Sequence, residues 1–124
     1  MSQLFISPLV MVGIICMVVL QGGTIFNFID LWALIVVTIP AFLFAMAGTK
    51  DLKTRVYNFA DGAVLAAWIG LLIGAIMILN NLDFDNWQEA LGPACAVMLL
   101  TVFYGHMLKA VCFLIAENLP EEKS

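Results

Sequence analysis

The sequence predicts an all-α membrane protein with four transmembrane helices, and three observations support this fold class. First, 64% of the 124 residues are hydrophobic and only 11% are charged, whereas a soluble domain is about 25% charged. Second, the apolar runs do not alternate with period two, which disfavours membrane-spanning strands. Third, even the shortest run covers about 25 Å as a helix, close to the roughly 30 Å of a bilayer core. The runs are 4–20, 31–48, 60–79 and 90–116.

Charge and cysteine content exclude several kinds of protein. Five Lys and Arg against nine Asp and Glu give a net charge of −4, so there is no basic patch to neutralise nucleic-acid phosphates. The single His and the three Cys form no CxxC pair, which leaves too few ligands for a zinc site or a disulfide framework. We therefore expect no nucleic-acid partner, no metal and no cofactor.

The first two runs are expected to be retained helices. Run 4–20 has the length of a signal peptide, but it lacks a basic n-region, and Gln21 to Thr24 do not form a convincing small-x-small cleavage site. Run 31–48 contains Pro40 near its centre, where a proline frees a backbone carbonyl and bends the helix. A packing kink is the plainest interpretation of Pro40.

The third run, 60–79, presents small residues at helical spacing, including a GxxxG motif. Small residues let helix backbones approach closely in lipid. This face either packs against another helix of the chain or lines a narrow lumen, and the pattern leaves both open. Its members are Ala63, Ala67, Gly70 and Gly74.

The fourth run, 90–116, carries one hydroxyl in an otherwise smooth stripe. Pro93 is expected in the first helical turn, where the missing N–H costs nothing, so it marks the helix start. Thr101 falls near the middle of the bilayer, where its hydroxyl either bonds the carbonyl of the preceding turn or offers a polar step to an ion or water. The stripe consists of Ala94, Val97, Thr101, Gly105 and Leu108.

Basic residues orient the helices relative to the membrane. Lys50, Lys53 and Arg55 lie between the second and third runs, whereas the other two loops contain no Lys or Arg. The middle loop and both termini are therefore expected in the cytoplasm. Asp61 and Lys109 then share the inner surface, where they pair unless Lys109 extends to the lipid headgroups. The outward-facing acids, which either attract cations or only aid solubility, are Asp30, Asp83, Asp85 and Glu89.

No catalytic constellation is present, so an enzyme is not expected. The loops between the runs are short, and we treat residues 1–124 as a single transmembrane domain. The predicted membrane interior contains no carboxylate, which proton or sodium translocation normally requires. If this chain conducts ions, another subunit must supply that acid.

Three segments carry a resemblance to a known family. They are Gly22-Gly23-Thr24 followed by Phe28-Ile29-Asp30, then Gly70-Leu71-Leu72-Ile73-Gly74, and LGPACAVMLLTVFYG over 91–105, which is the most specific. In the same order they are similar to GGS…F(I/V)D, GTLIG and IGPAMAVALLTTLYG. The sequence thus resembles the MotA/TolQ/ExbB superfamily of ion-driven motor channels, and most of all the flagellar stator A subunit of the MotA/PomA type.

This resemblance implies a protein of the bacterial inner membrane. It implies a ring of five copies around two single-helix partner subunits of the MotB/TolR/ExbD type, each of which supplies the ion-carrying Asp. Thr101 matches the first of two threonines by the pore, and Asp30 matches the acid near the outer ion entrance. Ion flow in this family drives rotation of the ring around its partners.

The sequence also departs from the family pattern. Leu71 and Val102 stand where sodium-type relatives have Thr, which removes oxygen ligands and favours protons. Val64 replaces a Pro at the start of the third helix. Segment 49–59 stands in place of the long cytoplasmic domain with which stator subunits push the flagellar rotor, so rotor contact of that kind is not expected.

Two functions from different classes follow. The favoured one is a subunit of a motor channel that uses proton-motive force together with a single-helix partner. The alternative is a pentameric membrane scaffold that keeps the ring and no longer conducts. A four-helix drug/proton exporter is less favoured, because such proteins need a carboxylate in the first helix and run 4–20 has none.

Overall fold

The computed structural model describes residues 2–23, 25–48, 51–82 and 85–120. Over these residues every regular element is a helix, which confirms the predicted all-α class. The elements are α1 (Ser2–Gly22), the short 3₁₀ helix η1 (Ile25–Phe28), α2 (Leu31–Met46), α3 (Leu52–Asn80) and α4 (Trp87–Glu117).

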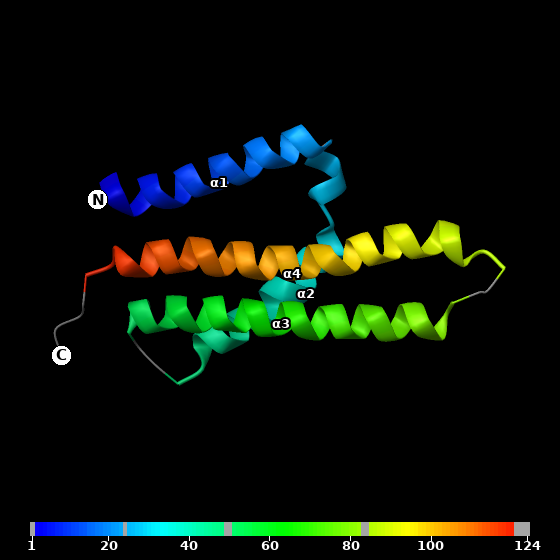
Figure 1. The fold of residues 1–124 in the computed structure, drawn as a ribbon. Coiled ribbons are helices and arrows are strands. Elements are labelled where there is room, and N and C mark those ends of the chain that lie inside the picture. Colours follow the sequence, from blue (N-terminus) through cyan, green and yellow to red (C-terminus); the bar gives the residue numbers. More distant parts are fainter. Residues whose placement is uncertain (1, 24, 49–50, 83–84, 121–124) are drawn as a thin grey trace.

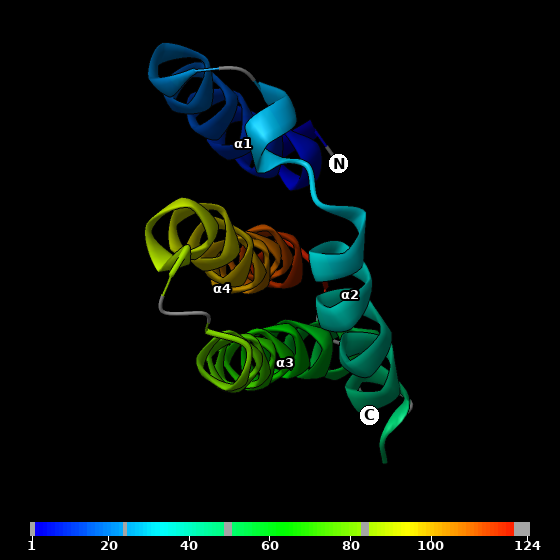
Figure 2. The same ribbon diagram turned by 90° about the vertical axis from the view of Figure 1, so that its right-hand side faces the viewer.

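The helices are arranged around one long antiparallel pair, α3 and α4 (Figure 1). α2 crosses both members of the pair obliquely on one side, as Figure 2 shows. α1 runs antiparallel to α4 along the edge of α4 that faces away from α3, and its main helix contact is with α4. The side of the α3–α4 pair opposite α2 is covered by no described helix.

The helix ends differ from the ends of the apolar runs. α3 begins at Leu52 rather than at 60, because the Asp51 carboxylate caps it by accepting the Thr54 N–H at 2.8 Å, which gives a partner to one of the otherwise unpaired N–H groups of the first turn. α2 ends at Met46 rather than at 48, where Ala47 is extended and Gly48 has a φ of 76°. Three positions used above lie outside the described residues: Thr24, Lys50 and Asp83.

The two prolines singled out in the sequence both lie inside helices. α4 begins at Trp87, so Pro93 is in its second turn, and the expectation that it marks the helix start is wrong. Asn86, the residue before α4, makes no side-chain cap. The first turn of α4 lies before the apolar run, so hydropathy did not predict it. α2 continues through Pro40, whose missing N–H leaves the Val36 carbonyl without its usual helical donor.

Among the described residues, α3 and α4 are long and apolar enough to cross a membrane. Residues Ile6–Gly22 of α1 and the whole of α2 form shorter apolar helices. The 16 residues of α2 extend about 24 Å, less than a bilayer core of roughly 30 Å. Two of the four predicted transmembrane segments therefore meet the length and composition expected of a span.

The buried core consists mainly of small side chains. Val37 is the largest side chain that is completely buried, and alanines surround it. Large apolar side chains lie mostly outside: Leu79 is 73% exposed and Trp32 is 77% exposed. An apolar exterior of this extent fits lipid or other membrane helices rather than water. The core cluster contains Ala33, Val37, Ala41, Ala63, Ala67 and Tyr104.

Candidate functional site

The backbones of α3 and α4 approach most closely at Gly105. A Cβ built on Gly105 would lie 2.4 Å from the Ala67 Cβ and 2.8 Å from the Ala63 carbonyl oxygen. Both distances are too short for real atoms, so only glycine fits at this position. The small residues of the third run thus serve close packing between helices of one chain, the first of the two readings that the sequence left open.

The GxxxG glycines of α3 continue this packing. A Cβ on Gly70 would lie 3.2 Å from Val36 of α2 and 3.6 Å from Thr101, and one on Gly74 would lie 3.2 Å from Met98. Gly70 therefore sits where α2, α3 and α4 meet. The alternative prediction, that this face lines a narrow lumen, applies to an assembly of several chains and stays a prediction.

Thr101 lies at the centre of the α3–α4 interface. Its side chain is 7% exposed, and among the described residues Thr101 and Tyr104 are the two buried side chains that carry a polar group. Its hydroxyl donates to the Met98 carbonyl at 2.7 Å, and the Ala67 carbonyl lies 3.4 Å from the same oxygen. The hydroxyl therefore makes the bond to the preceding turn that the sequence allowed, next to a second carbonyl presented by α3.

Asp30 caps α2 and is held by Tyr104, a contact that sequence reasoning missed. The Asp30 carboxylate accepts the Ala33 N–H at 3.0 Å. The Tyr104 hydroxyl accepts the Asp30 N–H at 2.9 Å and donates to the Phe28 carbonyl. A buried phenol needs a polar partner. The position of Tyr104 inside an apolar run was therefore the one sign in the sequence that it bonds another segment.

Asp30 and Glu89, which the sequence places together on the outer face, lie at different depths along α4. Asp30 lies beside Tyr104, whereas Glu89 is in the first turn of α4. The 15 residues from Glu89 to Tyr104 correspond to about 22 Å along the helix axis. The start of α2 therefore lies beside the middle of α4, as Figure 1 shows, and a single outer rim containing both acids is not what this chain forms.

Asp61 and Lys109 form an ion pair between α3 and α4, with Nζ 2.8 Å from Oδ1. The side chains remain 48% exposed for Lys109 and 63% exposed for Asp61. An ion pair this exposed contributes little to stability. It lies beside the start of the apolar run of α3, whereas α4 stays apolar beyond Lys109 as far as Ala116.

The remaining site residues of the sequence analysis do not gather around Thr101. Ala94 lines an apolar pocket between the far ends of α3 and α4, together with Met77 and Trp87. Val97 is 45% exposed, and Leu71 is half-buried. Among the described residues, no three His, Cys, Asp or Glu side chains come together as a metal site.

Comparison with known proteins finds similarity over part of the chain. Chemotaxis protein PomA of Vibrio alginolyticus is 42% identical over 62 residues, which is 49% of this chain. The match covers 23% of the length of that relative. No family model matches the chain, and no solved structure does. The similarity to PomA therefore points to a distant relationship with the MotA/PomA group.

Proposed function

We propose that this chain is the ring-forming subunit of an ion-driven motor channel in the bacterial inner membrane. The observation that carries the proposal is the 42% identity to PomA across 49% of the chain. In this proposal five copies surround single-helix subunits of the MotB type, each with the Asp that binds the ion. The chain itself supplies the apolar wall, the hydroxyl of Thr101 and the carboxylate of Asp30, which lies beside Tyr104 about one helical turn from Thr101.

The distribution of charge supports the proposed orientation. Lys53 and Arg55 lie at the start of α3, and Lys109 lies near the end of α4, so the basic residues gather at one end of the pair. Asp85 and Glu89 lie at the opposite end. Basic residues mark the cytoplasmic side of a membrane protein. All four helices take part in the proposed membrane domain, with both chain termini in the cytoplasm.

The ion in this proposal is the proton. Half-buried Leu71 and Val102 lie on the two helices that pack around Thr101 and provide no oxygen ligand. A dehydrated sodium ion needs several oxygen ligands, whereas a proton needs a chain of hydrogen-bonding groups. The link from α2 to α3 runs only from Met46 to Leu52, so the work done is not the push of a large cytoplasmic domain on a rotor.

Removing the Thr101 hydroxyl tests the function directly. Thr101→Val keeps the shape of the side chain and should lower proton flux about tenfold, the change that about 1.4 kcal/mol in the barrier produces. Flux is measured in vesicles that contain the chain together with the single-helix subunit that co-purifies with it. Unchanged flux contradicts the role of Thr101, and the absence of any such subunit contradicts the motor channel.

The matched control for this variant is Thr38→Val. The Thr38 hydroxyl donates to the Leu34 carbonyl at 2.8 Å, so it makes the same kind of bond to the preceding turn. Thr38 lies on α2, outside the α3–α4 interface. We expect its replacement to leave proton flux unchanged.

A non-conducting pentameric scaffold is the second candidate. The observation that favours it is the Thr101 hydroxyl, which already bonds Met98 within the chain. A ring purified with a lumen empty of any Asp-bearing helix would support the scaffold. A ring purified with such a helix inside would support the motor channel.

A further inference from the structure

Three cavities follow one another along the line where α1 meets α4, which we call the α1–α4 seam. Their volumes are about 320, 300 and 380 Å³. Ile15 and Phe103 line both the first and the second cavity, and His106 and Ala110 line both the second and the third. Because neighbouring cavities share lining residues, they lie next to one another along the seam, and together we call them the crevice.

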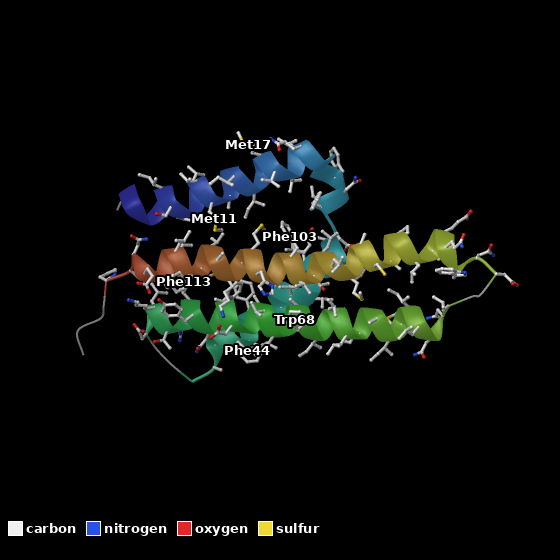
Figure 3. All side chains as sticks on the ribbon, viewed as in Figure 1. Met11, Met17, Phe44, Trp68, Phe103 and Phe113 are labelled. Carbon is white, nitrogen blue, oxygen red and sulfur yellow. The ribbon has the colours of Figure 1, made fainter. Side chains whose placement is uncertain are left out.

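Apart from Asp30 and Tyr104 in the first cavity, His106 in the second and third, and Lys109 in the third, the residues that line the crevice are apolar. Met11 of α1 and Phe103 of α4 lie in the space between the two helices, whereas Met17 points away from α4 (Figure 3). Water needs polar partners to occupy a cavity, and an empty cavity loses the dispersion contacts of its lining. A flexible hydrocarbon chain is the occupant that such walls accept best.

One end of the crevice carries a cation. Lys109 and His106 line the third cavity. Along the axis of α4, Lys109 lies about 9 Å from Phe103. The Lys109 ammonium has three N–H donors, of which the Asp61 carboxylate takes one at 2.8 Å. The Lys109 side chain remains 48% exposed, so it can donate to a second anionic oxygen.

We propose that the α1–α4 seam binds a glycerophospholipid, with one acyl chain between α1 and α4 and its phosphate against Lys109. The apolar walls match the hydrocarbon, and the ammonium matches the phosphate in charge. A phospholipid of the surrounding bilayer has direct access, because α1 packs mainly on α4 and is open on its other sides. The proposal depends on a membrane location and does not depend on ion conduction.

The experiment measures the phospholipid that stays with the purified protein after extended detergent washing, by lipid extraction and mass spectrometry. The wild-type chain should retain phospholipid in a fixed ratio to protein. Ala110→Phe places a ring in the space that two cavities share and should abolish retention. Leu99→Phe introduces the same aromatic ring at a position that is 59% exposed on α4 and lines none of the three cavities, so it should retain the lipid.

A second pair of variants tests the phosphate contact. Lys109→Gln should lose most of the retained phospholipid, whereas Asp61→Asn breaks the same ion pair, keeps the cation and should retain it. Circular dichroism establishes that each variant is helical. A wild-type protein without retained phospholipid, or an Ala110→Phe variant that retains as much as wild type, would overturn the proposal. Equal retention by Lys109→Gln and Asp61→Asn would overturn the assignment of the phosphate to Lys109.

Discussion

The α3–α4 crossing and the α1–α4 seam are packed in opposite ways, although α4 takes part in both. At the crossing, Gly105 lies so close to Ala67 that no Cβ fits. At the seam, three cavities of about 300 to 380 Å³ separate the helices. Lipid gives helices no hydrophobic reason to associate, so close packing depends on small residues. α3 presents alanines and glycines to α4, whereas α1 presents longer side chains such as Met11 and Ile15.

The largest expected difference between the two regions is the change in stability when a glycine is replaced by alanine. Gly105→Ala should destabilise the protein by about 1–3 kcal/mol, because the new Cβ collides with Ala67 and the Ala63 backbone. Gly13→Ala on α1 meets nothing within 4 Å and should stabilise by up to about 1 kcal/mol, because glycine is a poor helix former. Thermal unfolding in detergent measures both, and equal effects at the two positions would contradict the comparison.

An effect of similar size is expected at the junction of η1 with α2. Tyr104→Phe leaves the Asp30 N–H and the Phe28 carbonyl without their partner, at a cost of about 1–3 kcal/mol. Tyr57→Phe removes an exposed hydrogen bond to Glu117 and should leave the stability almost unchanged. Hydrogen exchange of the Asp30 amide should accelerate in the first variant and stay unchanged in the second. Unchanged exchange in Tyr104→Phe would show that the phenol does not hold this junction.

The smallest effect concerns the cap of α3, which lies outside the membrane-spanning segment. Hydrogen bonds from the Thr54 hydroxyl and the Thr54 N–H lower the pKa of Asp51. The stability that this cap contributes is therefore fully present above the ordinary pKa of about 3.9 and is lost as the pH falls through the lower folded value. The protection factor of the Thr54 amide should fall in strong acid, and Asp51→Asn should remove this dependence. A pH profile identical in both proteins would contradict the cap.

The sequence predicted the parts of the fold that depend on hydrophobicity. The four apolar runs correspond to the four α-helices, and the spacing of Ala63, Ala67, Gly70 and Gly74 identified the face of α3 that packs closely. The helix starts at Leu52 and Trp87 were missed, because polar residues outside the apolar runs form the first turns. A hydropathy pattern reports contact with lipid, not the hydrogen bonds that begin a helix.

The contacts between distant segments could not be predicted. Tyr104 and Asp30 are 74 positions apart, and only the path of α2 across the α3–α4 pair brings them together. For the same reason the sequence placed Asp30 and Glu89 on one rim, although α2 starts beside the middle of α4. The Asp61–Lys109 ion pair could be predicted from the sequence. The order of the apolar runs makes the third and fourth helices antiparallel neighbours, and both residues lie toward the same end of that pair.

Structure determination of the assembly purified from its native membrane tests the proposed motor channel most directly. The account predicts five copies of this chain around a lumen that holds single helices of another subunit, with an Asp of that subunit at the depth of Thr101. A single copy, a ring of another symmetry, or a fivefold ring whose lumen holds no acidic helix would contradict it.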